Sequence, residues 1–365
     1  MRAGWSRRRR RIAEGRPEMR LLVAGGAGFI GSAFVRRRLA ATADEIVVLD
    51  KLTYAGDRDN LAEVESDPAR AARYRFVHGD IADAQLVEPL VADVDAVVNF
   101  AAESHVDRSI LDAEAFLRTG VIGVHVLLEG VRTAVEADGR PRRLLQVSTD
   151  EVYGSVERGH SREDDRLAPR SPYAAAKAAG ELLVQAYRET HGLDVVVTRG
   201  ANTYGPYQHP EKLVPLFITN ALQDLPLPLY GDGDQRRDWL YVDDHADGVA
   251  AVLDRGQAGH AYNLPGAGER ANRDVTRAIL EQLGKPWSLV RRVPDRPGHD
   301  RRYAMDGGRA ASLGWRPGVE LASGLARTVE WYRANEAWWR RRRDAAWDAY
   351  YELQYGRRLA ESTEA

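Results

Sequence analysis

Two carboxylates lie side by side near the middle of the chain, in the sequence Thr149-Asp150-Glu151. Two close carboxylates do not readily ionise together, so one tends to keep its proton as an acid while the other serves as a base. They follow an apolar run, and a turn at the end of a buried strand can direct both towards one ligand. Taken alone, the pair is equally compatible with a solvated acidic turn.

Near the start of the chain, Gly25, Gly28 and Gly31 stand between an apolar run and a helix-like segment. Without side chains, the backbone turns tightly and can approach a pyrophosphate, which then meets the amides of the helix N-terminus. Asp50 ends the next apolar run, where a carboxylate accepts hydrogen bonds from an adenosine ribose and would repel a 2′-phosphate. The motif predicts NAD rather than NADP as cofactor. The alternative is a glycine-rich turn without a ligand.

Tyr173 and Lys177 are spaced by one helical turn and therefore share one face of a helix. A lysine ammonium beside a phenol, near a cationic nicotinamide, lowers the phenol pKa from about 10 towards neutrality. The phenolate can then take a hydroxyl proton while a hydride leaves for NAD. A surface pair without chemistry is the alternative, and the nucleotide motif upstream favours the catalytic interpretation.

Alternating apolar and helix-like segments must position these residues. Strands are expected over 20–24, 45–49, 74–78, 96–101, 144–148 and 195–199, with helices over 29–40, 85–91, 112–137 and 172–191. Strands this apolar are buried on both faces, as in a parallel sheet covered by helices. The sequence therefore predicts an α/β fold, a doubly wound parallel-sheet Rossmann domain with a smaller α/β C-terminal substrate domain.

The regular alternation stops after Arg199, where proline and glycine become dense. We expect the NAD-binding domain to span 19–200, with about 240–262 rejoining it through a helix near 243–253. The nucleotide-sugar domain would span 201–239 and 263–345, followed by a C-terminal tail over 346–365. The spacing of Trp331, Trp338 and Trp339 indicates packing rather than a binding platform.

Composition excludes several classes of protein. With 44% hydrophobic and 29% charged residues, the chain can bury a sizeable core, and the absence of cysteine excludes disulfides, thiolate catalysis and iron–sulfur clusters. Residues 1–18 form an Arg-rich tail, interpreted as a disordered extension or an upstream start before Met19, with a nucleic-acid or lipid arm as the alternative. No segment predicts a signal peptide or a membrane span. We expect a soluble, cytoplasmic protein that does not bind nucleic acid or membranes.

Several longer motifs resemble the extended short-chain dehydrogenase/reductases and, within them, the dTDP-glucose 4,6-dehydratase family. The similarity covers nearly all of residues 19–340, and SHVDRS and TDEVYG are typical of this branch. The motifs are GGAGFIGS (25–32), LDKLTYAG (49–56), HGDIAD (78–83), NFAAESHVDRSI (99–110), STDEVYG (148–154), YAAAK (173–177), NTYGPYQHPEKLVPLFITN (202–220), RDWLYVDDH (237–245) and DRPGHDRRYA (295–304).

The resemblance implies a role for each catalytic candidate. Tyr173 would deprotonate the 4-hydroxyl of the sugar, with Lys177 tuning its pKa and Thr149 hydrogen-bonding that oxygen. The 4-ketone formed by hydride transfer to NAD acidifies the proton on carbon 5. Glu151 would then remove that proton while Asp150 protonates the departing 6-hydroxyl, and hydride returns to carbon 6. The net reaction is loss of water.

The resemblance also implies two sets of binding residues and no metal. Those expected to bind NAD, with Tyr173 and Lys177, are Gly25, Gly28, Phe29, Ile30, Gly31, Asp50, Lys51, Leu52, Thr53, Asp80, Ile81, Ala101, Ala102, Glu103, Ser104 and Thr119. Those expected to hold the nucleotide sugar, with Thr149, are His105, Asn202, Lys212, Leu213, Pro228, Tyr230, Arg237, Asn263, Asp295, Arg296 and His299. Arg237 and Arg296 suit a diphosphate because a guanidinium fork matches its oxygens.

Three positions depart from the family pattern. Thr203 replaces a second Asn, Gly120 replaces Asn after Thr119, and residues 262–266 read YNLPG where Gly-Gly is common. These departures leave open another sugar or nucleobase, or a UDP-glucuronate-type decarboxylase or nucleotide-sugar 4-epimerase on the same scaffold. A non-catalytic NAD-sensing protein is a third hypothesis. The resemblance further implies a homodimer formed through the helices near 112–137 and 172–191.

Overall fold

The computed structural model describes residues 18–296 and 298–364, so residues 1–17 of the Arg-rich tail lie outside the described residues. Within them, the central element is a seven-stranded sheet in the order β10-β6-β5-β4-β1-β2-β3, and every pairing in it is parallel. This order confirms the predicted doubly wound fold. The strands are β1 (Arg20–Ala24), β2 (Glu45–Asp50), β3 (Tyr74–His78), β4 (Ala96–Asn99), β5 (Arg143–Thr149), β6 (Asp194–Gly200) and β10 (Ala261–Leu264).

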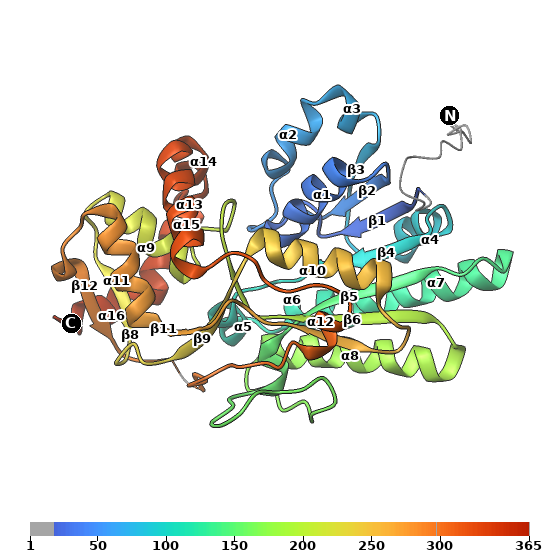
Figure 1. Ribbon diagram of the computed structural model, residues 1–365. Helices are drawn as coiled ribbons and strands as arrows, with labels where there is room; N and C mark the ends of the chain where they lie inside the picture. The colour runs from blue at the N-terminus through green and yellow to red at the C-terminus, as the bar shows by residue number, and fades with distance from the viewer. Residues whose placement is uncertain (1–17, 297, 365) are drawn as a thin grey trace.

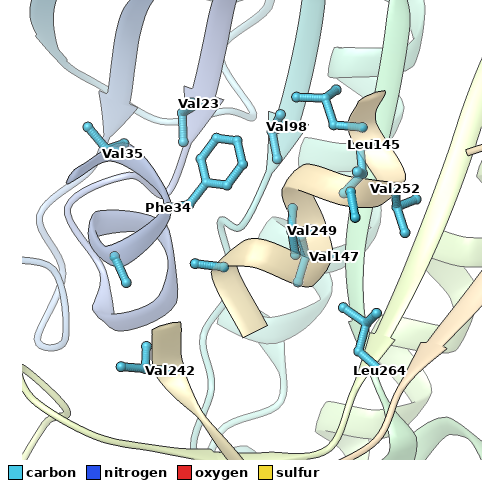
Figure 2. Packing of buried hydrophobic residues seen from close by; sticks show 14 of the residues in the cluster. Val23, Phe34, Val35, Val98, Leu145, Val147, Val242, Val249, Val252 and Leu264 are labelled. Atoms are coloured by element: carbon cyan, nitrogen blue, oxygen red, sulfur yellow. The ribbon is translucent and has the colours of Figure 1, made fainter. Parts of the chain in front are cut away.

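Helices cover both faces of this sheet (Figure 1). Alternate side chains of each strand point to opposite faces, so Leu21 and Val23 join one apolar core while Leu22 and Ala24 join the other. Figure 2 shows the first core, in which the ring of Phe34 lies between Val23 and Val98. Its helices are α1 (Phe29–Ala41) and α10 (Val242–Arg255), and those of the second core are α4 (Ala84–Ala92), α7 (Val124–Asp138) and α8 (Pro172–His191).

The helix expected over 112–137 is observed from Glu114 to Asp138, as α6 (Glu114–Leu117), the π-helical turn η2 (Arg118–Gly123) and α7 in succession. The short helix α5 (Val106–Leu111) precedes it. A Cβ on Gly123 would lie 2.4 Å from Ile81, and a Cβ on Gly180 of α8 would lie 2.7 Å from the carbonyl oxygen of Gly120. The close approach of these backbones is compatible with the wider turn, and periodicity alone did not predict it.

The strand expected over 96–101 ends early. Asn99 is its last residue, because the Asn99 side chain accepts a hydrogen bond from the amide of Ala101 at 3.1 Å and donates one to Gln146 at 2.8 Å. The chain therefore turns away from the sheet at this point, towards the glycine-rich turn after β1.

A third apolar cluster, separate from the two cores of the central sheet, holds the smaller C-terminal part together. It contains two three-stranded sheets, β11-β9-β7 and β13-β12-β8, with helices α9, α11 and α13 beside them (Figure 1). The bounds are β7 (Asn202–Tyr204), α9 (Leu213–Leu222), β8 (Leu227–Tyr230), β9 (Arg236–Tyr241), β11 (Glu269–Ala271), α11 (Asn272–Leu283), η4 (Trp287–Leu289), β12 (Val290–Val293), α12 (Gly308–Ser312), α13 (Leu321–Ala334) and β13 (Thr363–Glu364).

The segment expected to be a C-terminal tail is folded up to its last residues. It forms α15 (Ala345–Tyr351), η5 (Glu352–Gly356) and α16 (Arg357–Ala360), which follow α14 (Glu336–Arg342). The side chains of Trp347, Tyr350 and Tyr355 are buried. The remaining short elements are η1 (Arg58–Leu61), α2 (Ala62–Glu65), α3 (Pro68–Ala71) and η3 (Asp150–Tyr153).

Across residues 18–296 and 298–364, none of the helices is both long enough and apolar enough for a membrane crossing.

Candidate active site

The turn between β1 and α1 requires its glycines. Gly25 has a φ of 72°, and a Cβ on it would lie 2.4 Å from the amide nitrogen of Ala101. A Cβ on Gly31 would lie 2.2 Å from the carbonyl oxygen of Gly25. Side chains at either position would push the turn away from the strand end or from α1.

The N-terminus of α1 is open to an anion. Gly28 precedes the helix and offers no side chain to its first amides, and the first turn contains no acidic residue. Free amides and the positive end of the helix dipole favour a pyrophosphate at this point. The residues present therefore fit the dinucleotide that the glycine motif predicts.

Asp50 closes β2 beside this turn, with 8% of its surface exposed. Its Oδ2 accepts a hydrogen bond from the amide of Ala27 at 2.9 Å, and its Oδ1 accepts one from the amide of Leu52 at 2.8 Å. A carboxylate has about four lone-pair sites, so acceptor capacity remains for ribose hydroxyls. Burial raises the pKa of Asp50, and the two amide hydrogen bonds oppose that rise.

An open cleft of about 1120 Å³ runs along the carboxyl ends of the strands. Leu52 is the exception among the predicted cofactor residues: it does not line the cleft, its side chain is 36% exposed, and it contributes only its amide to Asp50. The predicted residues that do line it are Gly25, Gly28, Phe29, Ile30, Gly31, Asp50, Lys51, Thr53, Asp80, Ile81, Ala101, Ala102, Glu103, Ser104, Thr119, Tyr173 and Lys177.

The cleft also includes residues that were not predicted individually. Ala55 and Gly56 lie in the motif at 49–56, and Gln208 and His209 lie in the motif at 202–220. Ser148 has a buried Oγ without a hydrogen-bond partner, beside Tyr173 in the cleft wall. An unpaired buried hydroxyl indicates a place where a ligand atom would be accommodated.

Strand β5 and helix α8 position the predicted catalytic residues. The strand ends at Thr149 and η3 follows at once with both carboxylates, while the hydroxyl of Thr149 donates to Asp150 at 3.2 Å. Helix α8 begins after Ser171, whose Oγ accepts a hydrogen bond from the amide of Ala174 at 3.1 Å. This cap places Tyr173 in the first turn of α8, facing the cleft.

The two carboxylates differ in their electrostatic surroundings. Burial, and then the charge of Glu151, raises the pKa of Asp150 well above its ordinary value. Burial also raises the pKa of Glu151, and the positive charges of Arg296, Lys212 and Arg237 oppose that rise. These surroundings make Asp150 the better proton holder and Glu151 the better base, and the catalytic roles predicted for them stay a prediction.

The predicted lowering of the Tyr173 pKa involves a cationic nicotinamide as well as Lys177 and stays a prediction; the groups that the chain itself supplies act in the other direction. Burial, together with Glu151 and Asp150, raises the pKa of Tyr173 instead of lowering it. The ammonium of Lys177 donates to the carbonyl oxygen of Val147 at 2.9 Å, and burial lowers its pKa to about 8. Burial is the largest cause of the rise, ahead of the negative charges of the two nearby carboxylates.

A second pocket of about 700 Å³ lies beside Glu151. Glu151 and Arg296 line it together with Arg170, Asp300 and Tyr303, which were not predicted individually. The guanidinium of Arg237 is not among the lining groups. It donates to the carbonyl oxygens of Asp300 and Arg236, each at 2.8 Å.

Asp107 connects several of the predicted substrate residues, although the sequence did not single it out. One carboxylate oxygen accepts from Arg296 at 3.3 Å, and the other accepts from the hydroxyl of Tyr230 at 3.3 Å. The ring of Tyr230 packs against His299, and His299 contacts Asp295 at 2.5 Å. These contacts place Tyr230, Asp295, Arg296 and His299 in one cluster.

His105 is buried beside that cluster. Its Nδ1 accepts a hydrogen bond from the amide of Asp107 at 3.2 Å, and its ring packs against Tyr350. Burial, followed by the charges of Lys212 and Arg296, holds the pKa of His105 well below its ordinary value. His105 is therefore neutral at physiological pH.

Asn263 does not fit the role predicted for it. It lies fully buried in β10, its Oδ1 accepts from the hydroxyl of Tyr153 at 2.8 Å, and its Nδ2 donates to the carbonyl oxygen of Ser161 at 3.0 Å. No polar atom of the side chain remains for a substrate. Asn272, at the start of α11, has a buried Oδ1 without a partner and is the better candidate.

The other predicted substrate residues are spread along the second domain. The Oδ1 of Asn202 is buried and unpartnered, and the ammonium of Lys212 lines the cofactor cleft and donates to the carbonyl oxygen of Ser104 at 2.5 Å. Leu213 opens α9, and Pro228 lies in β8 beside Tyr230. In the part of the chain that the structure describes, no group of His, Asp and Glu side chains is arranged to hold a metal ion.

A family model described as GDP-mannose 4,6 dehydratase matches residues 22–328. The chain belongs to this family. Within the family, a dTDP-glucose 4,6-dehydratase of Streptomyces niveus is 51% identical over 327 residues, which cover 88% of this chain and 95% of the relative. The predicted resemblance is thereby confirmed.

Solved structures place family members on the same scaffold. A dTDP-glucose 4,6-dehydratase from Streptomyces venezuelae, determined with NAD bound, has a TM-score of 0.84 at 55% identity, and the match covers 89% of this chain and 100% of that chain. A UDP-glucose 4-epimerase of Thermus thermophilus, in complex with NAD, has a TM-score of 0.78 at 33% identity, covering 87% of this chain and 100% of that chain. The scaffold is therefore shared by dehydratases and epimerases.

Proposed function

We propose that the protein is an NAD-dependent nucleotide-sugar 4,6-dehydratase that converts dTDP-glucose to dTDP-4-keto-6-deoxyglucose and water. The observation that carries the proposal is the position of Asp150 and Glu151 at the end of β5, beside Tyr173 and Lys177 on α8. Hydride chemistry alone needs only the tyrosine and lysine, and the acid–base pair supplies what elimination of water requires. The match to dTDP-glucose 4,6-dehydratases along most of the chain supports the substrate.

The residues that line the cofactor cleft would hold NAD, which would supply a hydride acceptor for carbon 4 of the sugar and a hydride donor for carbon 6. Tyr173 takes the proton of the 4-hydroxyl, and Thr149 hydrogen-bonds the same oxygen. The phenol needs a positive charge near it, because the chain's own groups raise its pKa. Lys177 is held in place by its hydrogen bond to the carbonyl oxygen of Val147.

Elimination follows from the two carboxylates. The ketone at carbon 4 acidifies the proton on carbon 5, Glu151 removes that proton, and Asp150 delivers its proton to the departing 6-hydroxyl. Arg296 and Arg237 carry positive charge next to Glu151, where the diphosphate of the substrate would also be bound. Oxidation and reduction cancel, so the reaction is a net dehydration.

The test is incubation of the purified protein with dTDP-, UDP-, CDP- and GDP-glucose, followed by mass spectrometry. We expect a product lighter by one water from dTDP-glucose, and in heavy water one deuterium at carbon 5. The absence of that product with all four substrates would contradict the proposal. Release of carbon dioxide from UDP-glucuronate instead would favour the decarboxylase alternative.

A homodimer is the proposed assembly. Five large apolar side chains are at least 45% exposed on neighbouring elements α5, α6, η2 and α8, and they are Ile110, Leu111, Leu117, Ile122 and Leu182. Exposed large apolar side chains on neighbouring elements indicate a protein interface, and a second copy of this chain would cover them. Cytoplasmic location stays a prediction that cell fractionation would check.

A further inference from the structure

The wall of the cofactor cleft includes a loop that residues 51–61 form after β2, which we call the cofactor loop. Thr53, Ala55 and Gly56 of this loop line the cleft. The loop is tied to the glycine-rich turn, because the amide of Asp57 and the side chain of Asn60 both donate to the carbonyl oxygen of Ala27, at 3.1 and 2.8 Å. The position of the loop and the shape of the pyrophosphate site are thus linked.

Helix α14 reaches the outer side of the same loop from the C-terminal end of the chain. The indole of Trp338 donates to Asn60 Oδ1 at 3.1 Å, and Arg341 donates to Asp59 at 2.6 Å. Arg342 forms an ion pair with Asp57. These three side-chain contacts between α14 and the cofactor loop therefore join residues more than 270 positions apart in the chain.

Arg342 is the most firmly held of these side chains. Only 9% of its side chain is exposed, its guanidinium lies 3.7 Å from the ring centre of Trp338, and it also donates to the Trp338 carbonyl oxygen at 2.8 Å. A side chain that is already ordered loses little entropy when it binds, so its ion pair holds the loop more strongly than an exposed pair would.

The neighbouring Arg340 shows that a basic side chain on α14 does not necessarily contact the cofactor loop. Its partner is Glu336 of the same helix, with both side chains more than half exposed. Arg340 makes the local i,i+4 pair expected of a solvated helix face, whereas Arg341 and Arg342 reach across to another part of the chain.

We propose that Trp338, Arg341 and Arg342 are cofactor-positioning residues, a clasp that holds the cofactor loop closed over NAD and slows its release. The inference rests on the proposed function, in which each NAD is reduced and reoxidised within one turnover. Loss of the reduced cofactor midway would leave a keto sugar that cannot be completed. A latch on the cofactor loop keeps the cofactor in place until carbon 6 has been reduced.

The experiment measures dissociation of NAD from the purified holoenzyme after dilution into labelled NAD. We expect release about tenfold faster from the double variant Arg341→Ala/Arg342→Ala than from the wild type, and Arg342→Lys to restore part of the difference. Arg340→Ala is the matched control and should release NAD at the wild-type rate. The kcat of the double variant with saturating NAD should change less than its NAD release rate.

A variant on the loop side guards against misfolding of α14. Asp57→Asn keeps an oxygen that can accept from the Asp59 amide at the start of η1, but it removes the charge that Arg342 contacts. Faster release in Asp57→Asn supports the clasp even if the double variant fails to fold. Wild-type release in Asp57→Asn and in every folded arginine variant would overturn it. A wild-type protein with neither bound NAD nor dehydration activity would instead contradict the proposed function.

Discussion

Asp150 and Glu151 are adjacent in the chain, but only one of them has positive charges as its main electrostatic neighbours. Asp150 is 3% exposed and responds mostly to burial and to the charge of Glu151. Glu151 faces the pocket that also contains Arg296. The proposed division of labour between acid and base would therefore arise in the turn after β5, where consecutive residues have different electrostatic environments.

Exchange of hydrogen at carbon 5 separates the two roles. In Glu151→Gln we expect both dehydration and deuterium uptake at carbon 5 to fall by about 100-fold or more, because the base is absent. In Asp150→Asn dehydration should fall by a similar factor while carbon 5 still exchanges with heavy water. Mass spectrometry of the product measures dehydration, and mass spectrometry of the recovered dTDP-glucose measures deuterium uptake at carbon 5 in each variant. Equal exchange in the two variants would contradict the assignment.

Asp150 should also reduce stability at neutral pH. Its pKa is raised in the folded protein, so the folded state binds its proton more tightly than the unfolded chain does. The free energy of unfolding then decreases as pH rises from about 3.8 to the raised pKa. Asp150→Asn removes this effect, and we expect it to raise Tm at pH 7 by more than at pH 4. Calorimetry at the two pH values is the check, and an equal shift at both would argue against it.

The position of a candidate residue could be predicted where a motif determines the backbone, but not the hydrogen-bond partners of a buried side chain. The catalytic group lies at the end of β5 and the start of α8, as expected. Asn263 and Asn272 are both buried asparagines, and only the hydrogen-bond partners of Asn263 reveal that its side chain is fully used. The direction of the Tyr173 pKa likewise depended on burial, which the sequence does not give.

At the scale of elements, the glycine-rich turn is the part with the least freedom. It touches the chain just after β4 through Gly25 and the first turn of α1 through Gly31. The apolar strands and the helices that cover them were predicted to within a few residues, because buried parallel strands have an unbroken apolar pattern. The π-helical turn over 118–123 was not predicted, since the contact of η2 with α8 lies between segments distant in sequence.

Gly31→Ala should weaken NAD binding. The added Cβ would lie 2.2 Å from the Gly25 carbonyl oxygen, so the turn must move away from α1. We expect the Kd for NAD to rise by about tenfold or more, measured by calorimetric titration. Gly130→Ala in α7, where the nearest atom would be 3.4 Å away, is the control and should bind NAD normally. Unchanged affinity in Gly31→Ala would mean that the turn relaxes freely.

At the scale of the whole molecule, the C-terminal segment differs most from the prediction, because it is folded where a tail was expected. Its sequence is dense in Arg, Trp and Tyr, which suggested packing without saying against what. In the structure Tyr350 packs on His105, and Gln354 and Arg358 both donate to the hydroxyl of Tyr230, at 2.6 and 2.7 Å. Helix α14, which precedes this segment, contacts the cofactor loop. The chain from α14 onwards therefore contacts both the cofactor loop and the predicted substrate residues.

The assembly can be tested at this scale. Leu182→Glu places a charge on the exposed apolar surface of α8, where the side chain is 57% exposed. We expect sedimentation at micromolar concentration to show a dimer for the wild type and a monomer for this variant, with the fold retained. Leu353→Glu, at a site 69% exposed on η5, is the control and should remain dimeric. A monomeric wild type would refute the proposed homodimer.

The hydrogen bond between the Trp338 indole and Asn60 has an optical consequence. Emission from a tryptophan depends on the polarity and hydrogen bonding around its ring, and opening of the cofactor loop would expose this indole to water. The chain contains eight tryptophans, so the signal from Trp338 is isolated as the difference between the wild type and Trp338→Phe. Stopped-flow fluorescence would then follow loop movement directly, without any added label.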